Sequence, residues 1–245
     1  MADLSYGDSP FPVRPDLIEA HRRAWDRISG PGTWLTGKQR VAVIAEVRKA
    51  RDCACCAEIR AALSPYAVTG SHDATGNLPP AWTEMIHRVV ADPGRLTKGW
   101  YDRTIASGIA ETEFVEIVSM IAHATAIDTF AKGIGVPVRA LPAPKPGEPS
   151  RYRPKEAKHN DAWAPNIVWE EHGPNEADYF VGPASNIRRA LTLVPDEARG
   201  FFDVVAAQYL AGPQMRDFSQ EFREITHAQI ELLAARVSAI NQCTY

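Results

Sequence analysis

The four cysteines of this 245-residue chain are unevenly placed. Cys53, Cys55 and Cys56 lie within one short stretch, whereas Cys243 is almost the last residue. Residues three apart on a helix project from the same face, so Cys53 and Cys56 can bring their sulfurs together while Cys55 points elsewhere. In a reducing compartment such a Cys-x-x-Cys pair indicates redox chemistry or metal binding. We expect a redox-active pair; the alternative is two small thiols that only pack.

The reactive form of a cysteine is the thiolate, so a nearby cation or hydrogen-bond donor is needed to lower the thiol pKa. Arg51 and Arg60 are candidate cations because they are close in sequence. His72, in the polar loop SHDATGN, takes part if that loop folds back over the cysteines. A zinc site made of the four cysteines is not expected, because three come from one helical turn and cannot all face one ion. No metal or other cofactor is predicted.

The elements that must position these cysteines have helical patterns. Residues 15–29 predict a helix that begins at Pro15 and that Gly30-Pro31-Gly32 ends. Residues 36–63 predict one continuous helix with Thr36 as its N-cap, because they lack proline and have no glycine after Gly37. The cysteines then fall on this helix or at its end. Further helices are expected at 80–90, 95–107, 111–132, 184–193, 195–210 and from 226 onward.

The segment 111–132 is the most apolar part of the chain and predicts a central core helix. Residues 137–165 carry seven prolines, which predicts an extended arm or linker. No convincing alternation of apolar and polar residues argues for a sheet, so the predicted fold is an all-α helical bundle. We expect an N-terminal helical unit over 1–136, the arm over 137–165 and a C-terminal helical unit over 166–245, packed as one compact domain.

Two segments repeat one helical pattern. Residues 36–53 (TGKQRVAVIAEVRKARDC) align without a gap on residues 226–243 (THAQIELLAARVSAINQC). The identical pairs include Thr36 with Thr226, Gln39 with Gln229, Val47 with Val237 and Cys53 with Cys243. We interpret the two segments as one helix template used twice. The 111–132 helix fits the template less well, with Glu116 on Glu231 and Asp128 on Cys243.

With this repeat and this cysteine pair, both halves of the chain resemble the alkylhydroperoxidase D-like and carboxymuconolactone decarboxylase superfamily. Its all-helical repeat carries Glu, eleven residues, Cys-x-x-Cys, three residues and then His. The resemblance implies that Cys56 attacks a peroxide and that Cys53 resolves the sulfenic acid as a disulfide, without metal or flavin. It also implies a peroxide substrate, a thiol reductant or reductase partner, and a homo-oligomer.

The chain departs from that motif in three places. Arg60 stands where the family has its histidine, and arginine cannot shuttle a proton near neutral pH. Val41 stands where the N-terminal copy should have the relay glutamate. Glu231 and Cys243 keep the Glu-to-Cys spacing, but the second cysteine would fall after Tyr245. Either the polypeptide continues and completes a second site with Glu231, or Cys243 acts as a single thiol.

Two other functions compete with the peroxidase. A decarboxylase or lactone-processing enzyme of the same superfamily would use His123, Glu116 and Asp128 for proton transfer next to an enolate. His123 and Glu116 lie seven residues apart on one predicted helix and can line a pocket together. The alternative is that each is a buried side chain satisfied by other helices. The third function is a non-enzymatic helical oligomer whose proline-rich arm wraps a neighbour.

The charge and hydropathy of the chain argue against nucleic-acid and membrane partners. The formal net charge of −3 offers no broad basic surface for a phosphate backbone, so no nucleic-acid partner is expected. The N-terminal residues do not have the pattern of a secretory signal, and no uninterrupted apolar run is long enough to cross a bilayer. We therefore expect a cytoplasmic protein without a membrane partner.

Overall fold

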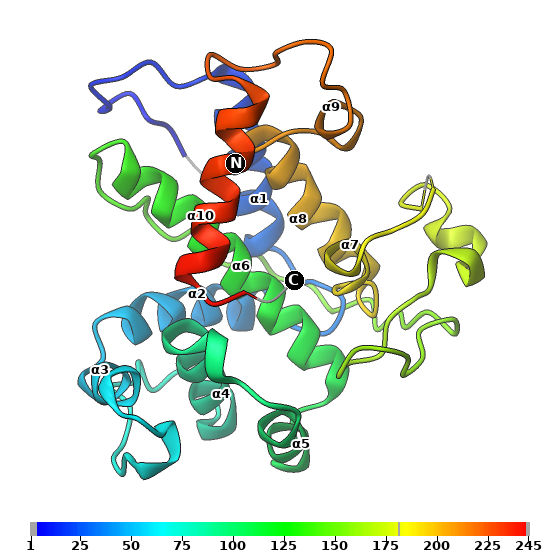
Figure 1. Ribbon diagram of the computed structural model, residues 1–245. Coiled ribbons are helices and arrows are strands. Elements are labelled where there is room, and N and C mark those ends of the chain that lie inside the picture. Colours follow the sequence, from blue (N-terminus) through cyan, green and yellow to red (C-terminus); the bar gives the residue numbers. More distant parts are fainter. Residues whose placement is uncertain (1–3, 181, 244–245) are drawn as a thin grey trace.

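The computed structural model describes residues 4–180 and 182–243, and these residues form an all-α bundle (Figure 1). Within them no β-strand occurs, and Lys158 and Asn166 form an isolated antiparallel bridge. The predicted fold class is therefore confirmed at the level of helical content. The α-helices are α1 Pro15–Ser29, α2 Gly37–Arg51, α3 Ala54–Ala61, α4 Pro80–Ala91, α5 Lys98–Ala106, α6 Glu111–Gly133, α7 Asn186–Arg189, α8 Pro195–Gln208, α9 Gly212–Met215 and α10 His227–Ile240.

Helices α2 and α10 begin with the same type of N-terminal cap. Thr36 Oγ1 accepts a hydrogen bond from the Gln39 backbone N–H at 3.3 Å, and Gln39 Oε1 accepts the Thr36 N–H at 2.9 Å. Thr226 and Gln229 form the equivalent pair of bonds at 3.3 and 2.8 Å. Such a capping box satisfies two backbone donors that the helix leaves unpaired. The predicted N-cap Thr36 and the predicted start of the last helix near residue 226 are confirmed, whereas the repeat of whole units stays a prediction.

Helices α2 and α6 supply much of the core. Val43, Ile44 and Val47 lie on one face of α2 and are fully buried, in one apolar cluster with Ile117 and Met120 of α6. The predicted central core helix at 111–132 is thus confirmed. Among the described residues α6 alone is long and apolar enough, by length and composition, to cross a membrane. In this structure 61% of its most apolar window is buried, as in a core helix of a bundle.

The predicted continuous helix over 36–63 is wrong, because the chain breaks between α2 and α3. Asp52 ends α2, and Cys53 has the extended conformation of an N-cap, with φ −74° and ψ 125°. The carboxylate of Asp73 accepts the first free backbone N–H of α3, that of Ala54, at 3.0 Å. A side-chain acceptor from the following loop therefore pairs a free backbone N–H at the start of α3. No glycine or proline in the local sequence indicates that a helix ends and another begins here.

The proline-rich segment 137–165 has no helix, as predicted, and it lies along the turn between α1 and α2 of its own chain. The Lys145 N–H donates to the Ser29 carbonyl at 2.7 Å, and the Arg151 N–H donates to the Thr33 carbonyl at 2.8 Å. These bonds satisfy backbone groups that proline-rich sequence cannot pair in a helix. The predicted helix over 184–193 shrinks to the four residues of α7.

A buried ion cluster joins three helices at the other end of α2. Arg40 is fully buried, and its Nη1 donates to Glu116 of α6 and, at 2.7 Å, to Glu197 of α8. Glu116 also accepts the backbone N–H of Trp34 at 2.7 Å. Gly32 passes so close to the Arg40–Glu116 pair that a Cβ at this position would collide with both side chains. Arg40 is thus the cation that forms an ion pair with both carboxylates.

Replacing Arg40 by methionine should destabilise the protein by about 3–5 kcal/mol, because it removes the cation that is bonded to two buried carboxylates. Urea unfolding followed by circular dichroism measures the change. Lys38→Met is the matched control: Lys38 lies on the same helix but is exposed, so its loss should change the free energy of unfolding by less than about 0.5 kcal/mol. Equal effects of the two substitutions would contradict this account of the cluster.

Candidate functional site

The break between α2 and α3 brings two cysteines into one buried place. Cys53 is the N-cap of α3 and Cys56 lies in its first turn, so both sulfurs are held at a helix N-terminus. Their side chains are 1% and 0% exposed, and both thiols are free. Cys55, between them in sequence, is partly exposed. The positive end of the α3 dipole favours a thiolate at this position.

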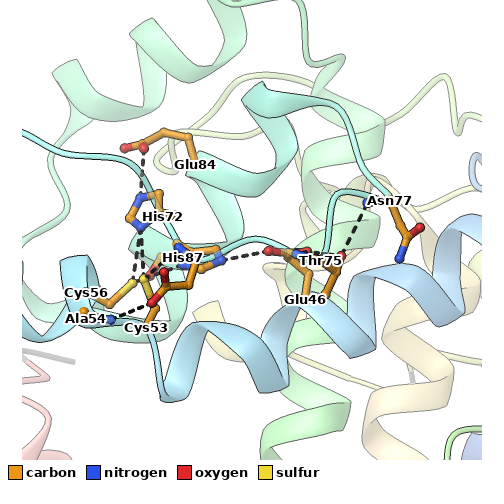
Figure 2. Close-up of polar contacts among 10 residues, drawn as sticks. Glu46, Cys53, Ala54, Cys56, His72, Thr75, Asn77, Glu84 and His87 are labelled. Atoms are coloured by element: carbon orange, nitrogen blue, oxygen red, sulfur yellow. Dashed lines mark hydrogen bonds and ion pairs between the residues drawn. The ribbon is translucent and has the colours of Figure 1, made fainter.

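The loop that follows α3 folds back over the sulfurs (Figure 2). His72 Nδ1 lies 3.5 Å from Cys56 Sγ and 3.7 Å from Cys53 Sγ, and His72 Nε2–H donates to Glu84 at 3.0 Å. The next residue, Asp73, donates its backbone N–H to Cys53 Sγ at 3.3 Å. The loop thus supplies one imidazole and one backbone donor to the cysteine pair.

A second imidazole reaches the pair from α4. His87 Nδ1 lies 3.2 Å from Cys56 Sγ, and His87 Nε2 lies 2.9 Å from Glu46 of α2. Because Glu46 is an acceptor, we assign the His87 proton to Nε2, which leaves Nδ1 free to accept the Cys56 thiol proton. Glu46 also accepts the backbone N–H of Thr75 at 3.0 Å and the Thr75 hydroxyl. One buried carboxylate therefore orients the second imidazole and anchors the loop that carries the first.

The two imidazoles differ in charge. Hydrogen bonds to Cys56 and Glu84 raise the pKa of His72 to about 11, so His72 is a cation that faces the sulfurs. Burial lowers the pKa of His87, which keeps that imidazole neutral at pH 7. Burial opposes ionisation of Glu46, but hydrogen bonds from Thr75 and His87 lower its pKa below the ordinary value. The site therefore holds one cationic and one neutral imidazole against the same sulfur.

The two thiols also differ. Burial acts to raise the pKa of Cys53, but the N–H of Asp73 and other hydrogen bonds to its sulfur outweigh burial and lower the pKa. Burial raises the pKa of Cys56, which has no backbone donor of its own from the loop. Cys53 is therefore the more acidic thiol, and Cys56 is the thiol whose proton has an acceptor in His87.

A cavity of about 380 Å³ borders the site on the side of His72. Cys55, His72, Glu84 and Arg88 are among the residues that line it. A small molecule in this cavity would meet His72 before the sulfurs, which lie behind it in the protein interior. Water is largely excluded from the sulfurs themselves, since Cys53 and Cys56 are almost completely buried.

Of the residues singled out in the sequence, the structure brings Cys53, Cys56 and His72 together. The two candidate cations are wrong: Arg51 is bound to Asp128 at 2.9 Å, and Arg60 is exposed. The cation at the sulfurs is His72. The same four side chains could hold a metal ion, because the ligand atoms of Cys53, Cys56, His72 and His87 all lie within 4.8 Å of one another.

Glu46, Glu84 and His87 were not predicted from the sequence. The family motif places the relay carboxylate at position 41, whereas the structure has a carboxylate at Glu46, five residues further along α2. A signal was present, since Glu46 interrupts the apolar stripe of Val43 and Val47, and a charge in such a stripe needs a buried partner. His87 likewise follows the buried Met85-Ile86 pair of α4. Neither residue has a motif spacing to the cysteines.

His123 and Glu116 lie in a different part of the core. Arg27 Nη2 is 2.7 Å from His123 Nε2, and Glu116 binds Arg40. Arg27 and Arg40 line a cavity of about 610 Å³, whereas His123 and Glu116 are not among its lining residues. Burial raises the pKa of Glu116 to about 7 and lowers that of His123 to about 4. Both side chains have partners on other helices, as in the alternative that each is a buried, satisfied side chain.

Glu231 lies on α10, and Cys243 follows the end of that helix. Glu231 accepts a hydrogen bond from the Tyr209 hydroxyl at 2.5 Å, and Cys243 is exposed just after α10. The two residues lie at opposite ends of a helix that spans roughly 1.5 Å per residue, so they do not contact each other. Residues 244 and 245 lie outside the described part of the chain.

Comparison with family models, with curated proteins and with solved structures finds no match to this chain.

The four thiols should differ widely in their reaction with a bulky alkylating reagent. N-ethylmaleimide should modify Cys243 and Cys55 first, because Cys243 is exposed and Cys55 is partly exposed. Cys53 and Cys56 should react only on the timescale of local opening. Peptide mass spectrometry after timed alkylation of the native, reduced protein measures the order. Early modification of Cys56 would show that the site is open and that the described burial does not hold in solution.

Proposed function

We propose that this protein is a cysteine-based peroxidase or thiol–disulfide oxidoreductase that reduces organic hydroperoxides or hydrogen peroxide at Cys53 and Cys56. One observation carries the proposal: the Cys56 sulfur lies 3.2 and 3.5 Å from two imidazoles, each held by its own carboxylate. Such a chain of thiol, imidazole and carboxylate is how proteins activate a cysteine nucleophile. A second thiol lies within reach to complete a disulfide.

In the proposed reaction His87 Nδ1 takes the proton of Cys56, and the thiolate attacks one peroxide oxygen. The S–O bond forms as the O–O bond breaks, and the leaving alkoxide receives a proton from His72 to give the alcohol. The Cys53 thiolate then attacks the sulfur of the Cys56 sulfenic acid, so that the S–S bond forms as the S–O bond breaks. The departing hydroxide takes the proton that His87 received from Cys56 and leaves as water. Two thiols and one hydroperoxide thus yield a disulfide, an alcohol and water. A thiol reductant or reductase partner returns the two electrons.

The resemblance to the alkylhydroperoxidase D-like superfamily supports this proposal, although the relay glutamate and histidine stand at other positions of the chain. In place of a glutamate at position 41 and a histidine at position 60, the chain offers Glu46 and His87. We extend the proposal to a repeat of two helical units, for which the matching caps of α2 and α10 are the support. Glu231 and Cys243 would then belong to the second unit, and Cys243 would act there as a single thiol or as half of a pair.

The proposal includes a homo-oligomer in the cytoplasm, where thiol reductants are available. Its support is the apolar surface of α10, on which Leu232, Leu233, Val237 and Ile240 are each more than half exposed. Several large apolar side chains exposed on one helix are typical of a protein–protein contact. Light scattering of the purified protein gives the subunit number.

A carboxymuconolactone decarboxylase-like activity is the second candidate, and the raised pKa of Glu116 favours it, since a carboxyl group with a pKa of about 7 suits proton transfer near neutral pH. Against it, Asp128 is paired with Arg48 and Arg51, and His123 is fully buried against Arg27. Cysteine blocking separates the two candidates, because the decarboxylase needs no thiol.

Substituting the site residues in metal-free, reduced protein should separate their roles. Cys56→Ser should reduce peroxidase activity to background. His87→Asn should lower the rate by roughly 10²–10⁴-fold, the usual contribution of an acid–base group. Glu46→Gln should act in the same direction, because an amide donor facing Nε2 favours the His87 tautomer that cannot accept from Cys56. The consumption of cumene hydroperoxide with a thiol reductant measures each rate.

Cys55→Ser is the matched control, since it removes a thiol from the same helical turn without touching the imidazoles. It should keep the rate of the unmodified protein and the same melting temperature. Full activity of Cys56→Ser would overturn the proposal. Retention of the helical circular dichroism spectrum in each variant shows that a lost rate is not a lost fold.

A further inference from the structure

The four side chains at the cysteine pair have the separations of a tetrahedral ligand set. Their donor atoms all lie within 4.8 Å of one another. The sulfur-to-nitrogen distances are 3.7 Å for Cys53 to His72, 3.5 Å for Cys56 to His72 and 3.2 Å for Cys56 to His87. A tetrahedral zinc ion with bonds of roughly 2.3 Å to sulfur and roughly 2.0 Å to nitrogen requires about 3.5 Å between such neighbours.

The outer hydrogen bonds prepare both imidazoles for the same task. Glu84 accepts from Nε2 of His72 at 3.0 Å, and Glu46 accepts from Nε2 of His87 at 2.9 Å. Both Nδ1 atoms therefore face the sulfurs. Carboxylates placed behind the ligating histidines fix the tautomer and the ring orientation, and they recur around protein-bound zinc. The backbone N–H of Asp73 donates a hydrogen bond to the Cys53 sulfur and so holds it in place.

The surroundings favour zinc among the metal ions. Two thiolates and two imidazoles form a soft, four-coordinate set that suits zinc and offers no oxygen ligand for magnesium or calcium. Three of the four ligands are 1% exposed or less, so the set is closed to solvent in the manner of a structural site. The sequence argument against zinc concerned a site made of the four cysteines. In the structure the four candidate ligands are two of those cysteines, Cys53 and Cys56, together with His72 and His87.

We propose that the reduced protein binds one Zn²⁺ ion through Cys53, Cys56, His72 and His87. The ion ties together three segments that come from separate parts of the sequence: the start of α3, the loop that carries His72, and α4. The described loop residues 68–79 form no helix, so metal ligation at His72 adds to the anchors at Asp73 and Thr75.

Zinc binding also regulates the peroxide chemistry, and this part rests on the proposed function. The ion occupies the lone pairs that attack the peroxide and the imidazole nitrogens that move protons, so the zinc-bound protein is the resting form. Reaction of the bound thiolates with a hydroperoxide and two protons gives the disulfide, an alcohol, water and free Zn²⁺. Two electrons pass from the sulfurs to the peroxide, and the disulfide no longer holds the metal.

Cobalt titration of the reduced, metal-free protein tests the site directly, with Co²⁺ as the spectroscopic probe. One Co²⁺ per chain should bind and give thiolate-to-cobalt charge transfer together with the visible bands of tetrahedral cobalt, and Zn²⁺ should displace it. Cys53→Ser should abolish this spectrum. Glu84→Gln keeps all four ligands and changes a half-exposed side chain; it should weaken metal binding roughly 10–100-fold.

Cys55→Ser and Cys243→Ser are the controls and should bind cobalt like the unmodified protein. No tetrahedral spectrum in the unmodified protein, or an unchanged spectrum in Cys53→Ser, would overturn the proposal. Cumene hydroperoxide added to the zinc-loaded protein should release the ion to a chromogenic chelator. Bound zinc that peroxide does not release would leave the zinc site standing and remove its regulation by peroxide. Absence of peroxide consumption by the metal-free protein would remove the proposed function and leave the zinc site standing, whereas peroxide consumption without cobalt binding would do the reverse.

Discussion

Helix α2 buries two charged side chains, Arg40 and Glu46, and a buried charge is tolerated only where partners surround it. Arg40 requires the carboxylates of α6 and α8, which fixes how those helices pack on α2. Glu46, a turn and a half later, requires His87 of α4 and Thr75 of the preceding loop. Two charges on one helix thus determine which segments pack against it. Arg40 binds α6 and α8 in the core, and Glu46 binds α4 and the loop at the site.

The site exists because these partners meet at the break between α2 and α3. Asp73 accepts the first backbone N–H of α3 and donates its own N–H to Cys53, so one residue both supports the break and contacts a sulfur. His87, held by Glu46, contacts Cys56 from α4. The functional groups come from α2, the start of α3, a loop and α4, and the fold converts this dispersed set into one buried cluster (Figure 2).

Local rules predicted much of the fold and little of this cluster. Pro15, Gly30 and the Thr36 cap gave the bounds of α1 and the start of α2, because helix ends depend on neighbouring residues. The break at Cys53 depends on Asp73, which lies outside any local window. Cys53, Cys56 and His72 were found by residue type, whereas His87 and Glu46 become visible only when α2 and α4 are packed together.

The central claim is that Cys53 and Cys56 form one redox pair, and a thiol count tests it most directly. Reduced, metal-free protein is treated with one equivalent of cumene hydroperoxide; free thiols are counted before and after, and disulfides are located by peptide mapping. The account predicts that two of the four thiols disappear and that a Cys53–Cys56 disulfide appears. Four intact thiols, or a loss confined to Cys55 and Cys243, would contradict it.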